Sequence, residues 1–325
     1  MALLDSVTPQ QKLAGNLALA IGTSVWATHF LVTGELLESW DPYFITAGRL
    51  LSATLFLMAA FIIQSRGRPF RGLRWGPALL LGSVGIAGST VCLTLGVKYA
   101  GAVPAAIVAA SSPILAAFVA RLGFRMPLTL AVILGAVVAV CGGVFAAIGN
   151  MEGGASALLA GNTAGIANLR GGEFLILLAL TIFTWYSIGA QRWMIGSSQL
   201  GITAITIMIG GLTMLFAIPV LILAGVAQPE FSLDWRSIGF IFYLGAGPAS
   251  FSLFTWHWGV SRVGVTIASI YSNLVPVVVV VIRMIQGEPP TTEHLIGGVL
   301  IICGVLIAQL LPTRNLAEAK LRKSA

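Results

Sequence analysis

Charged residues are scarce in this sequence. Only 9% of the 325 residues are charged and 57% are hydrophobic, whereas about a quarter of the residues in soluble domains are charged. The mean hydropathy is +0.95, and no soluble core buries that much apolar surface, so the expected solvent is lipid. The net charge of +7 lies in short connections between apolar runs, so it predicts membrane topology rather than a nucleic-acid partner.

Cysteine and buried acid are also scarce. Cys92, Cys141 and Cys303 stand inside apolar runs without CxxC or Cys/His spacing, so neither a metal site, a disulfide framework nor a cofactor is expected. No Asp or Glu lies in the middle of an apolar run and there is no HExxH motif. These absences exclude proteolysis by paired aspartates or zinc, argue weakly against ion coupling through a carboxylate, and predict that the chain is not an enzyme.

Long apolar runs dominate what remains. They are continuous rather than alternating, which favours helices over a lipid-facing barrel. The first is longer than a signal-peptide core and is expected to be retained. The ten expected membrane spans cover residues 13–33, 42–64, 76–97, 104–121, 128–149, 174–193, 201–226, 236–258, 264–285 and 295–312.

One stretch of the chain occurs twice, as residues 82–127 and 245–290. A weaker earlier match sets residues 20–26 beside 179–185, and a later one sets Cys141-Gly142 beside Cys303-Gly304. A shared order of Gly, Pro and Cys over this length indicates an internal repeat. The aligned stretches pair Gly82 with Gly245, Gly96-Val97 with Gly259-Val260, Gly101 with Gly264, Pro113 with Pro276 and Pro127 with Pro290.

The repeat sets the expected domain organisation. Residues 1–149 form one five-helix unit and residues 174–312 the other, joined by a Gly-, Ala- and Asn-rich extracytoplasmic linker at 150–173 and followed by a basic cytoplasmic tail at 313–325. Because five is odd, the second unit enters the membrane from the opposite side. The predicted fold is an all-α integral membrane protein with ten transmembrane helices in two inverted five-helix repeats, an arrangement common in secondary transporters.

Lys and Arg predict the orientation. With a cytoplasmic N-terminus, thirteen of them fall on the inner side and four on the outer side, while nine acids fall outside and two inside. The excess of inner positive charge predicts a multi-pass protein of the cell's inner membrane with both termini cytoplasmic.

Arg49, seven residues after Pro42 in the second run, is the most informative polar residue. A charge at that depth turns toward a cavity or a partner, so Arg49 is a candidate counter-charge for a substrate carboxylate. The alternatives are an outward-reaching side chain or a partner such as Glu35, Glu38 or a carbonyl. His29, three residues after Trp26 on one helix face, is a candidate for substrate or proton binding, or a hydrogen-bonded structural residue.

The fourth and ninth runs carry polar residues around a repeated proline. Ser111, Ser112 and Pro113 match the region of Tyr271, Ser272, Asn273 and Pro276. Proline frees a carbonyl that neighbouring hydroxyls or a ligand satisfy, although small residues also serve helix packing. Trp185 and Tyr186, beside Trp26 in the weaker match, either wall the same cavity or only pack. His257, between Trp256 and Trp258, is expected near the inner end of the eighth run.

These features resemble the EamA family of the drug/metabolite transporter superfamily. The stretch GVKYAGAVPAAIVAASSP at 96–113 is the clearest match, and Trp26 and Arg49 are similar to that family's first-helix Trp and second-helix Arg. The family usually follows that Trp with Gly, where this chain has Ala27. The resemblance implies a carrier that exports amino acids and related metabolites from bacterial cells.

The expected function is therefore alternating-access export of a small amphipathic metabolite such as an amino acid. A passive channel or pore is the alternative. A membrane enzyme lacks its paired acids, and a scaffold lacks an appended domain. The expected partners are a small molecule, such as one that bears a carboxylate, and the lipid bilayer. The expected substrate-binding residues are Trp26, His29, Arg49, Ser111, Ser112, Trp185, Tyr271 and Asn273.

Overall fold

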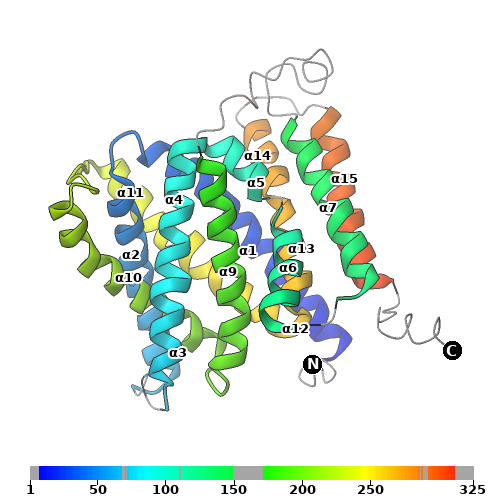
Figure 1. Ribbon diagram of the computed structural model, residues 1–325, viewed down its shortest axis with the longest axis horizontal. Coiled ribbons are helices and arrows are strands. Elements are labelled where there is room, and N and C mark those ends of the chain that lie inside the picture. The colour runs from blue at the N-terminus through cyan, green and yellow to red at the C-terminus, as the bar shows by residue number, and fades with distance from the viewer. Residues whose placement is uncertain are drawn as a thin grey trace.

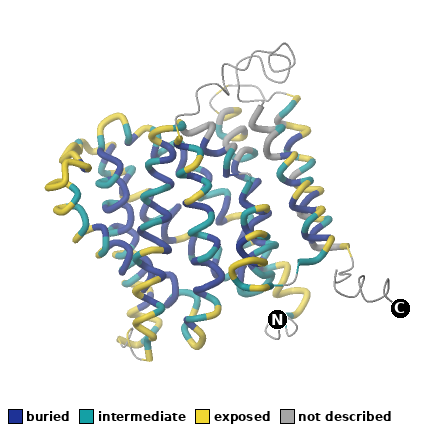
Figure 2. Tube along the Cα trace, viewed as in Figure 1, coloured by how far each residue is buried: buried dark blue, intermediate teal, exposed yellow. Residues whose placement is uncertain are grey.

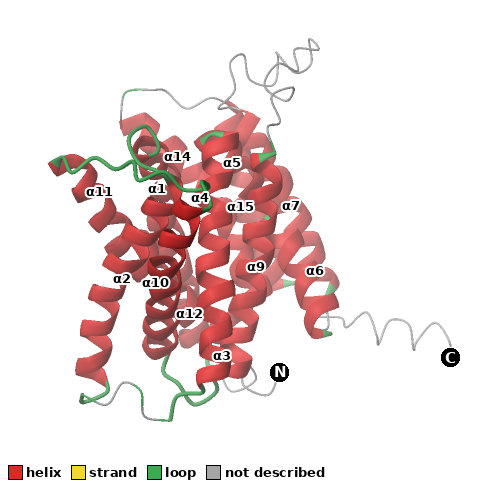
Figure 3. Cartoon of the chain, turned by 60° about the vertical axis from the view of Figure 1, so that its left-hand side comes forward, coloured by secondary structure: helices red, strands yellow, loops and turns green. Residues whose placement is uncertain are grey.

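The computed structural model describes residues 7–67, 70, 72–109, 111–126, 128–148, 171–285, 287 and 292–311. Over these residues the chain is a helical bundle without strands, and its loops gather at the two ends (Figure 3). Most of the predicted linker at 150–173 and the tail at 313–325 lie outside the described residues.

Helices long and apolar enough to cross a membrane make up most of the bundle. Their outward faces carry large apolar side chains such as Ile63, Phe216 and Leu223, which are 79%, 74% and 89% exposed. Figure 2 places the buried residues in the middle of the bundle. Apolar side chains facing outward along whole helices fit a lipid environment. Six such stretches occur among the described residues: Pro9–Leu36, Pro42–Gln64, Trp75–Ala100, Gly172–Trp193, Gln199–Leu223 and Trp235–Val263.

Four of these stretches are α1 (Pro9–Leu36), α2 (Pro42–Gln64), α9 (Gly172–Trp193) and α10 (Gln199–Leu223). The other two contain a π-helical segment. In the first, α3 (Trp75–Leu80) passes through η1 (Leu81–Gly88) into α4 (Ser89–Ala100). In the second, α11 (Trp235–Leu244) passes through η2 (Gly245–Phe251) into α12 (Ser252–Val263).

The expected fourth and ninth spans are broken near their middles. The fourth consists of α5 (Ala102–Ala109) and α6 (Ser112–Phe124). The ninth consists of α13 (Val265–Ile270), the 3-10 turn η3 (Tyr271–Asn273) and α14 (Leu274–Ile285). The fifth and tenth correspond to α7 (Leu130–Ile148) and α15 (Thr292–Leu310). The number of membrane crossings stays a prediction.

Local sequence signals set several helix ends. Thr8 and Gln11 form a capping box before α1, and Asp41 caps α2 by accepting from the Tyr43 N–H at 2.9 Å. α4 ends at Gly101 and α12 at Gly264, with φ values of 87° and 84°. Residues other than glycine rarely adopt a backbone conformation with positive φ, so glycine is required at both of these matched positions.

Glycines from the two matched stretches also make matching contacts. A methyl group on Gly96 would overlap Ile176 and one on Gly259 would overlap Leu19, because each glycine lets α4 or α12 approach its neighbour closely. Ile176 on α9 therefore corresponds to Leu19 on α1. Trp26 lies seven residues after Leu19, and Phe183 lies seven residues after Ile176, so these contacts pair Trp26 with Phe183. The weaker sequence match, which set Trp26 beside Trp185, is therefore wrong by two residues.

In the bundle, α7 and α15 lie side by side at one edge, away from α2 and α10 (Figure 1). They approach closely at Gly135 and Gly304, where a methyl group on either glycine would meet the other's backbone oxygen at 2.5 to 2.6 Å. The start of α1 and the end of α15 lie at the same end of the bundle (Figure 1).

Candidate functional site

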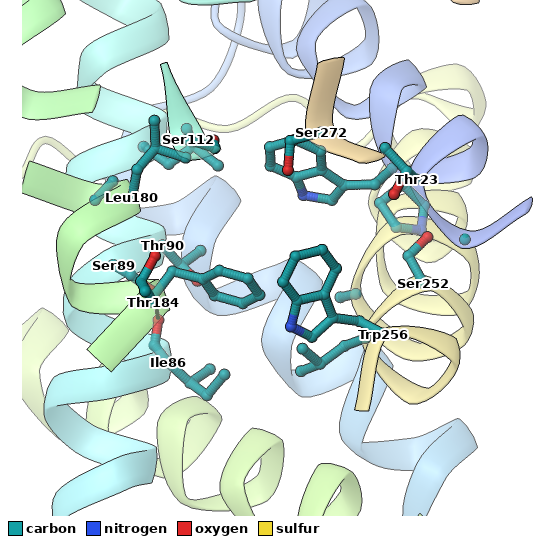
Figure 4. Close-up of a pocket in the computed structure, with 18 of the residues that line it drawn as sticks. Thr23, Ile86, Ser89, Thr90, Ser112, Leu180, Thr184, Ser252, Trp256 and Ser272 are labelled. Carbon is teal, nitrogen blue, oxygen red and sulfur yellow. Dashed lines mark hydrogen bonds between the residues drawn. The ribbon is translucent and has the colours of Figure 1, made fainter. Parts of the chain in front are cut away.

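A cavity occupies the middle of the bundle. Its empty volume is about 970 Å³, open solvent at its mouth included. Its walls combine α1, α2, η1 and α4 with α9, α10, η2 and α12, so residues from both matched parts of the chain face one another across it (Figure 4). Leu19 to Trp26 on α1 and Ala179 to Thr184 on α9 place it near the mid-length of those helices.

Arg49 is the one charged side chain among the described residues that line the cavity. It is 5% exposed. Its Nη1 lies 3.0 and 3.1 Å from the two ring nitrogens of His29, so the guanidinium rests against the imidazole. Its Nε is buried and has no hydrogen-bond partner within the described chain. A buried guanidinium with an unused donor is a strong attractor for a carboxylate.

Glu35, one proposed partner of Arg49, instead forms an ion pair with Arg236 at the end of the bundle. Both side chains of that pair are well exposed, at 44% and 69%. No Asp or Glu of the described residues lines the cavity, so no carboxylate there neutralises the charge of Arg49.

Hydroxyl groups form the second polar component of the cavity. Ser89, Ser112, Ser252 and Ser269 donate their protons to backbone carbonyls three to five residues earlier in the chain, which leaves only acceptor lone pairs for a ligand. The other four make no hydrogen bond within the described chain, so their protons are free to bind a ligand. These four are Thr23, Thr90, Thr184 and Ser272.

Aromatic side chains supply much of the apolar wall. Phe183 packs against Trp256 with ring centroids 5.5 Å apart, and Trp256 donates its indole N–H to Ser187 Oγ at 3.0 Å, which fixes the ring. Trp26 lies on the same wall as Thr23. In Figure 4, Trp256 and Thr23 face Thr184 and Thr90 across the space. The site therefore suits a small amphipathic molecule with one anionic group.

Comparison with known proteins identifies the class. The profile of the EamA-like transporter family matches residues 13–148 and again residues 170–310. This chain belongs to that family. It is thus a multi-pass membrane protein of a transporter family, as the cavity and the apolar outer surface indicate.

Relatives of the chain carry transporter names. YyaM of Bacillus subtilis, an uncharacterized transporter, is 26% identical over 71% of this chain and 72% of its own length. YetK of the same organism, also an uncharacterized transporter, is 25% identical over 91% and 85%. A probable terminal-alkyne amino-acid exporter of Streptantibioticus cattleyicolor is 23% identical over 89% and 91%. A crystal structure at 22% identity has a TM-score of 0.72 over 93% and 97%, a likeness of fold alone.

Of the eight residues predicted from the sequence of this EamA-family chain, Trp26, Arg49 and Ser112 line the cavity. His29 is fully buried behind Arg49, and its Nδ1 lies 2.8 Å from Thr33 Oγ1. Ser111 donates to the Val108 carbonyl at 2.7 Å. Their role in substrate binding stays a prediction.

The remaining three predicted residues also lie off the cavity lining within the described chain. Trp185 packs edge-on against Trp193, with ring centroids 5.5 Å apart. Tyr271 is buried against a core that includes Val260. Asn273 is fully buried, and its Nδ2 donates to the Ile270 carbonyl at 3.3 Å while its Oδ1 has no partner in the described residues.

The sequence held signals for residues that were missed. Ser89 and Ser252 are matched by the same alignment that pairs Gly82 with Gly245, and both line the cavity. Phe183 and Thr184 would have been selected in place of Trp185 and Tyr186 had the match of the first helix been shifted by two residues. Across the described residues, no three His, Cys, Asp or Glu side chains group closely enough to hold a metal ion.

Proposed function

We propose that this EamA-family protein is a secondary transporter that exports small amphipathic metabolites, amino acids among them, across the inner membrane. The observation that carries the proposal is the mid-bundle cavity in which Arg49 keeps a buried, unpartnered Nε. A fixed cation beside apolar walls is suited to a carboxylate with an apolar body.

Transport follows from two inverted halves of five membrane spans each, which rock around the cavity. The matching conformations of Gly101 and Gly264, and the matching π-helical segments η1 and η2, support this arrangement. The excess of Lys and Arg on one side of the predicted spans supports cytoplasmic termini. Because helical breaks at matched positions border many transporter sites, the interruptions before Ser112 and at η3 fit the same mechanism.

Each wall has a role in this proposal. Arg49 binds the carboxylate, with His29 holding the guanidinium in place from behind. The free hydroxyls of Thr23, Thr90, Thr184 and Ser272 bind the remaining polar groups of the substrate. The rings of Trp26, Phe183 and Trp256 cover its apolar part. The name of the Streptantibioticus cattleyicolor relative, a probable exporter of a terminal-alkyne amino acid, supports a cargo that joins a carboxylate to an apolar side chain.

Counterflow in liposomes tests the proposal. The purified protein is reconstituted into vesicles preloaded with one unlabelled amino acid, and entry of the same labelled compound is followed, with each of the common amino acids tried in turn. Saturable entry that requires the internal compound supports a carrier. Flux that neither saturates nor depends on the internal compound would contradict it and establish a passive pore.

A further inference from the structure

A second histidine lies just behind the cavity wall. His257 is on α12, next to the cavity-lining Trp256, and is fully buried. Its ring packs against Tyr186 with centroids 5.4 Å apart, and Tyr186 packs against the cavity-lining Phe183 at 5.9 Å. Two aromatic rings in succession, Tyr186 and the cavity-lining Phe183, therefore connect the imidazole of His257 to the cavity.

The hydrogen bonds of Thr203 fix the tautomer of His257. Thr203 Oγ1 donates its one proton to the Gln199 carbonyl at 2.8 Å. The same oxygen lies 2.8 Å from His257 Nδ1, and it can only accept there, so Nδ1 carries the ring proton. Nε2 is then left with a lone pair, and it is buried without a hydrogen-bond partner within the described chain.

Tyr186 offers no proton to that lone pair. Thr206 Oγ1 donates to the Ile202 carbonyl at 2.7 Å, so the Tyr186 hydroxyl, 2.8 Å from the same oxygen, donates to it. The Nδ1–H of His257 and the hydroxyl proton of Tyr186 are thus both engaged, in hydrogen bonds to Thr203 and Thr206. A buried acceptor without a hydrogen bond lowers the stability of the fold, and Nε2 of His257 is such an acceptor.

The elements around α12 bring few charges toward His257. α10, η2 and α13 contain no ionisable side chain. In α9 and α1 the ionisable side chains other than Tyr186 and His29 lie near the helix ends, and they are Lys12, Glu35, Glu173 and Arg192. The helix α12 itself contains Arg262 in its last turn. Among the described residues, Tyr186 is the titratable group in ring contact with His257.

His29 does not offer the same opportunity. The guanidinium of Arg49, a permanent cation, already rests on its ring, whereas the ring of His257 contacts Tyr186 and Thr203, neither of which carries a charge. Ionisable side chains held within a membrane bundle commonly serve proton pathways. The contrast selects His257 over His29 as the group that accepts a proton.

We propose that Nε2 of His257 is the binding site of a coupling proton. The proton enters from water on one side, forms an N–H bond at Nε2, and leaves to water on the other side after the two halves have rocked. A positive charge on His257, behind the rings of Tyr186 and Phe183, adds to that of Arg49 and strengthens carboxylate binding. The proton and an anionic cargo therefore move in the same direction, and the concentration gradient of the cargo drives the export of both, a step that rests on the proposed transport function.

Nuclear magnetic resonance tests the site without any substrate. The chain contains only three histidines, so nitrogen-labelled histidine in the purified protein gives a simple spectrum, and His257→Asn identifies the signals of His257. The expected spectrum at neutral pH shows the proton on Nδ1 and none on Nε2. A proton found on Nε2 would overturn the proposal.

Vesicle experiments then test the coupling. Acidifying the side that holds a labelled amino acid active in counterflow should speed its efflux several-fold in the wild type, and an ionophore that collapses the gradient should abolish the effect. In His257→Asn, whose amide can still donate to Thr203, counterflow should stay within about twofold while the response to acid is lost.

Thr203→Val serves as a second variant, because it removes the acceptor that fixes the tautomer, and it should weaken the response to acid without abolishing exchange. Wild-type efflux that ignores the gradient, or that accelerates with acid on the opposite side, would overturn the proposal. So would a full response in His257→Asn. If the wild type shows no counterflow of any amino acid, the proposed transport function is refuted instead.

Discussion

Matched positions in the two proposed repeats carry different chemistry. Gly82 packs on Ile209 and Gly245 on Ser52, so α2 and α10 correspond, and Arg49 and Thr206 each lie three residues earlier. In the first half Arg49 contacts His29; in the second half Thr206 accepts from Tyr186. The glycine contacts match in the two stretches, but of Arg49 and Thr206 only Arg49 carries a charge. In the proposed inverted repeat, similar packing therefore surrounds a cavity whose charge comes from the first repeat.

Removing the charge should have the largest effect on transport. Arg49→Ala deletes a charge-assisted hydrogen bond of about 1.5–3 kcal/mol, so kcat/KM for counterflow should fall about 10- to 100-fold. Thr206→Val at the equivalent position should change it less than threefold. Counterflow at several concentrations measures both, with the amount of folded protein checked by gel filtration. Equal losses in the two variants would remove the functional distinction between the halves.

Two equivalent glycines should differ in tolerance. A methyl group on Gly172 would lie 2.4 Å from the backbone N of Ala100, whereas one on Gly15 would lie 3.0 Å from Cβ and 3.3 Å from Cδ of Arg262, a milder crowding. Gly172→Ala should therefore cost about 1–3 kcal/mol and lower the Tm of the purified protein, while Gly15→Ala costs less. A larger loss of Tm for Gly15→Ala would contradict the packing described for α1 and α9.

Hydroxyl groups allow a finer comparison across the cavity. Thr184 has a free proton, while Ser252 donates its own to the Gly247 carbonyl at 3.3 Å. Thr184→Val should raise KM about 2- to 10-fold through loss of one hydrogen bond of about 0.5–1.5 kcal/mol. Ser252→Ala is the matched control and should leave KM within about twofold. The reverse order would show that the substrate uses acceptors rather than donors.

The smallest effect concerns the helix starts outside the cavity. Asp234 caps α11 by accepting from the Ser237 N–H at 3.0 Å, whereas α3, which begins the corresponding stretch of the first half, follows Arg74 without a side-chain cap. Hydrogen bonds from the side chains of Ser232 and Ser237 lower the pKa of Asp234 from its ordinary value. Its stabilising effect is therefore present above about pH 4 and is lost as the pH falls through the lowered pKa.

The matched variant is Asp234→Asn, which can still cap the helix but does not titrate. The wild type should have a slightly higher Tm at pH 7, and the difference between the two should shrink in acid. A difference that grows on acidification would show that the carboxylate of Asp234 does not stabilise the start of α11.

The sequence predicted the broad fold because lipid imposes long apolar runs and because glycine is needed where helices approach closely. Gly101 and Gly264 were matched from sequence alone, and both hold the backbone conformation that ends a helix. The π-helical character of η1 and η2 could not be predicted, since it depends on contacts between helices distant in sequence, such as Gly82 on Ile209.

The site was harder to predict than the fold. Arg49 stood out because a charge in an apolar run is rare, but the face that a serine or tryptophan presents depends on helix register. A two-residue error in matching α1 with α9 selected Trp185, which packs on Trp193, instead of the cavity-lining Phe183. The free hydroxyl of Thr184 could not be recognised without knowing which hydroxyl protons the backbone already uses.

The central claim is that Arg49 binds the carboxylate of the cargo. The most direct measurement compares counterflow of an amino acid with that of its carboxamide, in the wild type and in Arg49→Ala. The wild type should prefer the carboxylate about 10- to 100-fold, and Arg49→Ala should lose nearly all of that preference. If both proteins discriminate equally between the two compounds, Arg49 does not bind the carboxylate.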